Sequence, residues 1–317
     1  MPVVRLAVAL VIVSLSSWLP AQEAPDQAET LRERALKRFD KDGDGKLSPS
    51  ERARAREALL PGTAAAEHMT WTVGDLEREA LVYLPSKKSD EAAPVVFGFH
   101  GHGGSSQNAA RSFGFEKLWP EAIVVYMQGV PTPGRLTDPE GKRNGWQSDA
   151  GDQGDRDLKF FDAVLATLRE KYKVDDRRIY SSGHSNGGGF TYLLWAKRPD
   201  VFAAVAPSSA SSRRLLELTP KPAMHVAGRN DELVLFSWQE LAIAAVKKAN
   251  GCSATGSEWA KDCMQYPSDK DTPFIAFIHD GTHKYPAEAP PLIVRFFKEH
   301  AQAPAKQKAD AGDGAKQ

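Results

Sequence analysis

Short apolar runs alternate with amphipathic stretches over most of the chain. Between residues 70 and 300, runs rich in β-branched and aromatic residues are followed by stretches whose apolar residues recur at helical spacing. This alternation is typical of a mostly parallel sheet with crossover helices. The expected strands are residues 80–84, 94–99, 122–127, 178–182, 201–206, 223–227 and 274–279, and the expected helices are residues 158–172, 190–195 and 291–298.

The segments on either side of this region have other patterns. An almost wholly apolar run follows Arg5, and Ala21 is a plausible last residue before cleavage, so the first segment is expected to be an export signal. The run is too short for a comfortable membrane span of about 20 residues. The expected organisation is a signal (1–21), a small helical unit (22–62), a main α/β domain (67–300) and a disordered polar tail (301–317).

Composition narrows the classes of function. The chain of 317 residues carries 41 basic and 41 acidic side chains, so no global field favours nucleic acid. The hydrophobic content of 41% is that of an ordinary soluble globular protein. Cys252 and Cys263 lie close in sequence, and in an exported chain such a pair is expected to form a loop disulfide, with two buried thiols as the alternative.

The stretch Gly183-His184-Ser185-Asn186-Gly187 lies between an expected strand and an expected helix. A G-x-S-x-G sequence in this position is the nucleophile elbow of α/β-hydrolases, a sharp strand-to-helix turn that exposes the serine hydroxyl. Glycines two residues on either side let the neighbouring backbones pack closely. The alternative is a Gly/Ser-rich turn without chemistry.

A serine hydroxyl needs a base to take its proton, and the base works best when a carboxylate orients it. In α/β-hydrolases the order along the chain is serine, acid, histidine. Asp231 follows a strand after the elbow, with Glu232 as the neighbouring competitor. His283 follows the last strand, whereas its rival His279 belongs to that strand. Ser185, Asp231 and His283 are therefore the predicted triad.

An oxyanion hole needs backbone N–H groups that point to the developing negative charge. The loop Phe99-His100-Gly101-His102-Gly103-Gly104 follows an early strand, where this fold places such a loop. The expected donors are the backbone N–H groups of His102 and Asn186. The two loop histidines are unlikely metal ligands because no third ligand is near in sequence.

A long loop rich in Gly, Pro and Asp covers residues 129–157, and loops of this length are usually functional. Trp146 within it either stacks on an aromatic or sugar ring of the substrate or caps the core. Asp149, Asp152 and Asp155 either bind a cation or belong to a solvated loop in which Asp155 caps a helix.

Residues 40–51 match the EF-hand signature D-x-D-x-D-G-x5-E and lie between two helical runs. The expected calcium ligands are the carboxylates of Asp40, Asp42 and Asp44, the carbonyl of Lys46, a water-mediated contact from Ser48 and the bidentate carboxylate of Glu51, with Gly45 at the sharp turn. The alternative is a turn with a capping box, which is compatible with calcium binding. A single loop does not predict a paired calcium sensor.

The main domain resembles secreted esterases grouped with polyhydroxybutyrate depolymerases, feruloyl esterases and acetylxylan esterases. The stretches that carry the resemblance are residues 99–104, 128–129, 183–188, 202–207, 228–231 and 281–286, within a region from Glu77 to His300. The resemblance implies an α/β-hydrolase fold, ester hydrolysis through an acyl-enzyme, the roles given above for the triad, and pairing of Cys252 with Cys263. Tyr285 departs from the tryptophan that is usual at its position.

The sequence thus predicts a secreted or periplasmic serine esterase that acts on feruloyl, acetyl or hydroxyacyl esters, including esters of plant polysaccharide. The chemistry is expected to need no cofactor, and Ca2+ is expected in the EF-hand. Two alternatives remain at this point. One is an exported serine peptidase on the same fold, and the other is a calcium-binding surface protein with an inactive hydrolase core.

Overall fold

A computed structural model describes residues 31–48, 51, 55, 66–87 and 90–302. The chain divides into two compact units, Met1–Ala55 and Arg56–Gln317. The expected export signal, the linker, most of the second helix of the calcium loop and nearly all of the polar tail lie outside the described residues. No described helix is both long and apolar enough to cross a bilayer.

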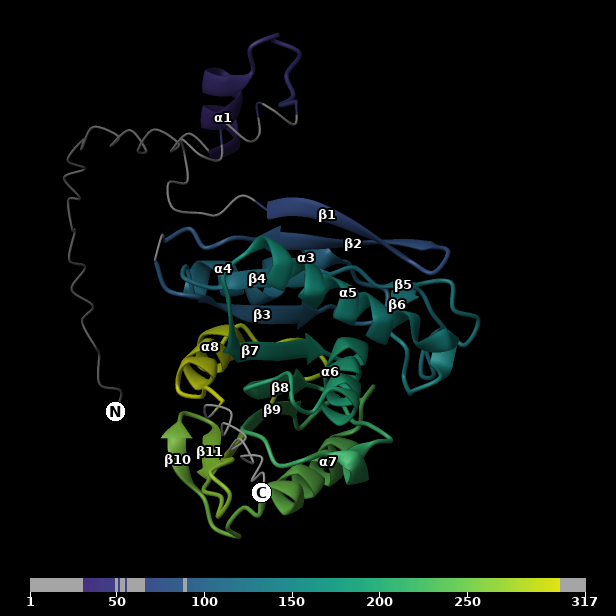
Figure 1. Ribbon diagram of the computed structural model, residues 1–317, viewed down its shortest axis with the longest axis vertical. Coiled ribbons are helices and arrows are strands. Elements are labelled where there is room, and N and C mark those ends of the chain that lie inside the picture. Colours follow the sequence, from purple (N-terminus) through teal and green to yellow (C-terminus); the bar gives the residue numbers. More distant parts are fainter. Residues whose placement is uncertain (1–30, 49–50, 52–54, 56–65, 88–89, 303–317) are drawn as a thin grey trace, which may run out of the picture. The chain divides into compact units, whose positions relative to one another are not determined.

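A ten-stranded sheet forms the centre of the second unit, in the order β1-β2-β4-β3-β7-β8-β9-β12-β11-β10 (Figure 1). The six strands from β4 to β12 in this order run parallel, and the pairs at both edges are antiparallel. The strands are β1 (Ala66–Val73), β2 (Leu76–Tyr83), β3 (Ala93–Phe99), β4 (Ile123–Met127), β7 (Val174–His184), β8 (Ala204–Ser208), β9 (Ala223–Gly228), β10 (Ser257–Ala260), β11 (Cys263–Tyr266) and β12 (Phe274–His279). The predicted mostly parallel sheet is confirmed.

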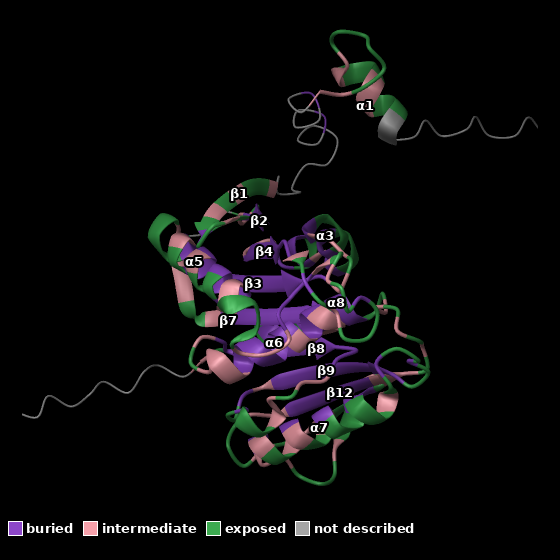
Figure 2. Ribbon diagram, turned by 90° about the vertical axis from the view of Figure 1, so that its right-hand side faces the viewer, coloured by how far each residue is buried: buried purple, intermediate pink, exposed green. Residues whose placement is uncertain are grey.

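Helices cover both faces of the sheet because its parallel strands are apolar on both sides. Side chains of α5 (Arg156–Lys171), α6 (Asn186–Lys197) and α7 (Phe236–Asn250) share one core with Val95, Phe97 and Phe99. Side chains of α3 (Ser106–Phe113), α4 (Phe115–Leu118) and α8 (Ala289–Lys298) share the opposite core with Val96. Figure 2 shows the buried central strands between helices whose outer surfaces are exposed.

Smaller elements complete the description. The short strands β5 (Val130–Pro131) and β6 (Asn144–Gly145) pair with each other, and the 3-10 helices η1 (Asp152–Asp155) and η2 (Leu215–Glu217) lie in loops. The first unit contains α1 (Leu31–Phe39). The sequence analysis did not identify α3, α4, α7, β1, β10 or β11, and it placed β8 three residues too early.

The expected disulfide is wrong, because Cys252 and Cys263 are both free thiols. Cys252 follows α7 and packs against the core on the α5, α6 and α7 face. Cys263 lies in β11 and belongs to the core on the opposite face. A disulfide requires Cβ atoms about 3.5–4.5 Å apart, which two side chains on opposite faces of a sheet do not reach.

Candidate active site

Ser185 lies at the junction of β7 and α6 in a backbone conformation that L-residues rarely adopt, with φ 58° and ψ −120°. The flanking glycines make the turn possible. A Cβ on Gly183 would lie 2.3 Å from the carbonyl oxygen of Gly187, and a Cβ on Gly187 would lie 2.2 Å from that of Phe99. Such strain costs about 1–3 kcal/mol and is concentrated at functional sites.

Three side chains from separate loops form a continuous hydrogen-bonded chain. The imidazole of His283 lies with Nε2 2.9 Å from Ser185 Oγ and with Nδ1 2.8 Å from Asp231 Oδ2. A carboxylate only accepts, so Nδ1 carries the proton and Nε2 accepts from the serine hydroxyl. The structure therefore brings together the three residues of the predicted triad, in the hydrogen-bond order that activates a serine.

The carboxylate of Asp231 is buried and receives three further hydrogen bonds. Oδ1 accepts from the backbone N–H groups of Leu233 at 3.0 Å and Val234 at 2.8 Å. Oδ2 also accepts from Gln239 Nε2 at 3.1 Å. These bonds fix the orientation of the carboxylate toward His283. Glu232, the alternative acid next to Asp231 in the sequence, is exposed to solvent.

Behind the carboxylate the hydrogen bonds continue into the core. Gln239 Oε1 lies 3.4 Å from His225 Nε2, and His225 Nδ1 lies 2.7 Å from the hydroxyl of Tyr192. Since an amide oxygen only accepts, His225 carries its proton on Nε2 and accepts from Tyr192. Burial lowers the pKa of His225 to about 4, so the ring is neutral at neutral pH. The missed helix α7 thus supplies Gln239, a residue that the sequence analysis did not single out.

The loop after β3 lies beside the nucleophile. Two of its backbone amides already have acceptors within the protein. Gly103 N–H donates to Asn144 O at 2.6 Å, and Gly104 N–H donates to Gly101 O at 2.9 Å. His102 lines the same cleft as Ser185 and Asn186. These two glycine amides are engaged within the protein, and the oxyanion role expected for the His102 amide stays a prediction.

Hydrogen bonds of the His100 and His102 side chains fix the position of this loop. The ring of His100 accepts from Gly129 N–H through Nε2 at 2.9 Å and donates from Nδ1 to Gly101 O at 2.8 Å. Burial lowers the pKa of His100 to about 4. His102 Nε2 donates to Asp138 Oδ2 at 3.0 Å, which ties the loop to the segment between β5 and β6. The bond to His102 is the largest cause that lowers the pKa of Asp138 to about 2.

Trp146 was a candidate for stacking on the substrate, and this hypothesis is wrong. Its side chain is 0% exposed and packs against Phe99 and Phe190, with Nε1 donating to His100 O at 2.9 Å. Its backbone is held at the elbow, because Trp146 N–H donates to Asn186 Oδ1 at 2.7 Å and Asn186 Nδ2 donates to Trp146 O at 3.0 Å. Trp146 is therefore a core residue that supports the elbow.

Two of the three candidate acidic side chains of the long loop, Asp149 and Asp155, are bound by protein donors. Asp155 accepts from Gly151 N–H at 2.8 Å and from Gln147 Nε2 at 2.9 Å, and it makes no side-chain cap to α5. Asp149 is bound by Arg214. Their carboxylates serve the loop's own hydrogen bonds.

A cleft of about 660 Å³ opens at Ser185 and His283. Three large apolar side chains that are partly exposed line it, namely Leu136 (53% exposed), Leu233 (36%) and Trp238 (40%). Apolar side chains at the rim suit the hydrophobic part of a substrate. Leu233 and Trp238 lie in an apolar stretch of the sequence directly after Asp231. This stretch is the sequence signal that could have identified them as cleft residues.

The ring of His184 makes no hydrogen bond to Ser185 Oγ, the contact that a general base requires. Its Nδ1 lies 3.3 Å from Ser208 Oγ, and its ring packs 5.0 Å from that of His283. Burial is the main cause that lowers the pKa of His184 to about 4, and the neighbouring His283 adds to the effect. The other rival, His279, uses its ring to accept from Gly281 N–H at 3.0 Å. Neither replaces His283.

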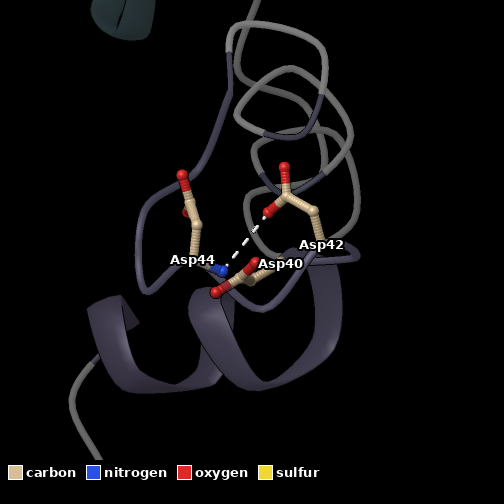
Figure 3. A group of neighbouring side chains, drawn as sticks. All are labelled: Asp40, Asp42 and Asp44. Atoms are coloured by element: carbon tan, nitrogen blue, oxygen red, sulfur yellow. Dashed lines mark hydrogen bonds between the residues drawn. The ribbon is translucent and has the colours of Figure 1, made fainter.

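In the first unit, the loop after α1 gathers three carboxylates (Figure 3). Oxygens of Asp40, Asp42 and Asp44 all lie within 4.8 Å of one another. Gly45 has φ 75°, as the sharp turn of an EF-hand loop requires. Glu51 is buried at the end of the loop and accepts from Lys41 N–H at 2.7 Å. This all-oxygen donor set fits a hard cation such as Ca2+.

Comparisons with known proteins find similarity to hydrolases. A model of the prolyl oligopeptidase family matches residues 145–216, which include the elbow. A probable feruloyl esterase C of Aspergillus clavatus is 28% identical over 216 residues, which are 65% of this chain and 75% of that protein. A bifunctional acetylxylan esterase/xylanase of Neocallimastix patriciarum is 27% identical over 53% of this chain and only 24% of its own length.

Among solved structures, an acetyl xylan esterase from Aspergillus awamori superposes with a TM-score of 0.55 at 14% identity, over 74% of this chain and 99% of that one. The fold is the α/β-hydrolase fold. In sequence, the chain is similar to esterases.

Proposed function

We propose that the chain hydrolyses carboxylic esters through an acyl-enzyme, with Ser185 as nucleophile, His283 as general base and acid, and Asp231 as the group that orients the imidazole. One observation carries the proposal. The Ser185 hydroxyl lies 2.9 Å from His283 Nε2, at a strained turn that opens into the cleft. A strained, exposed serine in contact with a carboxylate-oriented histidine has the geometry of an activated nucleophile.

The reaction follows from these contacts. Ser185 Oγ attacks the ester carbonyl carbon while His283 Nε2 takes the hydroxyl proton. The backbone N–H groups of His102 and Asn186 stabilise the oxyanion. The C–O bond to the alcohol then breaks, and the alcohol leaves with the proton from Nε2. Water attacks the acyl-enzyme in the same way, returns its proton through His283 and releases the carboxylic acid and free Ser185.

The proposed substrates are feruloyl, acetyl or hydroxyacyl esters, including esters of plant polysaccharide. The apolar side chains of Leu136, Leu233 and Trp238 at the cleft support an acyl or aromatic group there. The names of the feruloyl and acetylxylan esterase relatives support the same classes. Trp238, which is 40% exposed at the cleft, offers an aromatic surface for stacking, the role that the buried Trp146 does not fill.

The test is turnover of a panel of p-nitrophenyl acetate, methyl ferulate and a short hydroxyacyl ester. Ser185→Ala should reduce kcat by at least about 10³-fold, because removal of the nucleophile leaves only binding and oxyanion stabilisation. The matched control is Ser253→Ala, at an exposed serine beyond α7, which should retain wild-type rates. A Ser185→Ala variant that is folded and active would refute the proposal.

A serine peptidase on the same fold is the second candidate, and the match to the prolyl oligopeptidase family model favours it. It would use the same triad on an amide bond. Side-by-side assays of ester and peptide substrates separate the two candidates, since an esterase should show no comparable rate on unactivated peptide bonds.

The first unit is proposed to bind one Ca2+ through the carboxylates of Asp40, Asp42, Asp44 and Glu51 and the carbonyl of Lys46. Export is proposed from the signal-like residues 1–21, which lie outside the described part of the chain. A secreted or periplasmic location would provide the millimolar calcium concentrations that an extracellular-type site requires.

A further inference from the structure

The cleft is positively charged although the chain as a whole is neutral. Arg135, Arg143 and Arg213 line the cleft, and none of its lining residues is acidic. The full chain has equal numbers of basic and acidic side chains. A cleft lined by charges of one sign attracts ligands of the opposite sign.

Arg143, one of the three arginines, binds other groups of the protein. Arg143 donates from Nη2 to Thr137 O at 2.9 Å, and its Nε lies 3.8 Å from Asp138 Oδ2. Gly134 and Asp138 exchange backbone hydrogen bonds of 2.7 and 3.0 Å, which close a tight turn with Arg135 and Leu136 at its tip. Arg143 therefore stabilises the turn that places Arg135 at the cleft.

The other two arginines have no carboxylate within 4.0 Å in the part of the chain that the structure describes. Asp149 is near Arg213, but the neighbouring Arg214 binds it and also contacts Glu217 Oε1 at 2.5 Å. Arg214, not Arg213, is the largest cause that lowers the pKa of Asp149. Arg135 and Arg213 are thus exposed cations whose charge is not offset by an ion pair.

We propose that the preferred ester carries a carboxylate group, which Arg135 and Arg213 attract and orient while the ester carbonyl lies at Ser185. The inference rests on the proposed esterase function and names the substrate class of the same site. Because both arginines are solvent-exposed and lie outside the triad, they act on substrate binding and on the rate of encounter. An exposed ion pair changes an equilibrium by about threefold, so the two together should contribute about tenfold.

Matched substrates test the proposal. The acyl-side pair is mono-p-nitrophenyl adipate and its methyl ester, which differ by one charge. The alcohol-side pair is an acetylated uronic acid and its methyl ester. In at least one pair, the wild-type protein should show a KM for the anion about tenfold below that for the neutral ester, with similar kcat. The preference should fall at about 0.5 M sodium chloride, because salt screens exposed charges.

The Arg135→Gln/Arg213→Gln double variant should raise KM for the anionic ester about tenfold and leave the kinetics of the neutral ester unchanged. Unchanged kinetics on the neutral ester show that the variant is folded. The control is Arg111→Gln, at an exposed arginine of α3 outside the cleft, which changes the net charge by one without changing the preference.

The results distinguish this inference from the esterase function. Turnover of the neutral esters with no preference for the anion in either pair would overturn the anionic-substrate proposal and leave the esterase standing. Failure to hydrolyse any of the four esters would overturn both. A charge preference that survives in the double variant would also contradict the assignment, because it would place the recognition elsewhere.

Discussion

At the scale of single residues, the site depends on conformations that only certain side chains allow. The strained φ of Ser185 persists because glycines at 183 and 187 admit neighbouring carbonyls at distances that a Cβ would forbid. The buried carboxylate of Asp231 is held by two backbone amides and by Gln239. Orientation of the imidazole is therefore determined before substrate arrives, which is how preorganisation contributes to catalysis.

Gln239 offers a test of this preorganisation. The Gln239→Leu variant removes the donor to Asp231 Oδ2 and leaves His225 Nε2 without its acceptor. We expect kcat on p-nitrophenyl acetate to fall about tenfold with little change in KM, because the carboxylate acts through His283 and does not contact substrate. Steady-state kinetics on the variant measure both constants.

The control for this variant is Gln265→Leu, in strand β11, which lies between β10 and β12. It should have wild-type kinetics. A Gln239→Leu variant that changes KM alone, or that matches the wild type in both constants, would show that Gln239 does not position the acid.

At the scale of elements, the parallel strands and the helices α5, α6 and α8 could be predicted. The strands are apolar runs, α5 and α8 have apolar residues at helical spacing, and α6 follows the G-x-S-x-G motif. The motif order after those strands also indicated Ser185, Asp231 and His283. Helix α7 was missed because its start is apolar on the exposed side as well, as Trp238 shows. The cysteines were paired from their spacing, the expected export and the family resemblance. None of these carries information on which of the two cores each cysteine joins.

The calcium loop is an element whose role the sequence predicts and calorimetry can test. Titration of the full chain with Ca2+ should give one site, and Asp44→Ala should weaken binding at least about tenfold, since each carboxylate contributes charge to the site. The control is Asp75→Ala, at an exposed aspartate in the turn between β1 and β2. Equal binding by both variants and the wild type, or no heat at all, would show that the loop is only a capped turn.

At the scale of the whole molecule, buried histidines couple stability to pH. Burial lowers the pKa of both His100 and His225 to about 4 from the ordinary value of 6.5. Between these values the unfolded chain binds a proton at each ring and the folded chain does not. The free energy of unfolding should therefore fall as pH is lowered from 6.5 to 4, and it should rise again on return.

Urea denaturation at several pH values measures this slope. His225→Gln should reduce it by about 1.4 kcal/mol per pH unit, which is the contribution of one proton. The exposed control His68→Gln, on β1, should keep the wild-type slope. A His225→Gln variant whose stability depends on pH as steeply as that of the wild type would show that folding does not lower the pKa of His225.

The most direct measurement for the account as a whole is covalent labelling with a fluorophosphonate, followed by peptide mapping. Ser185, activated by His283, should carry one adduct per chain, and His283→Ala should slow labelling by at least about 10³-fold, because the hydroxyl then lacks its base. An adduct on another residue, or an active esterase that takes up no label at Ser185, would contradict the central claim.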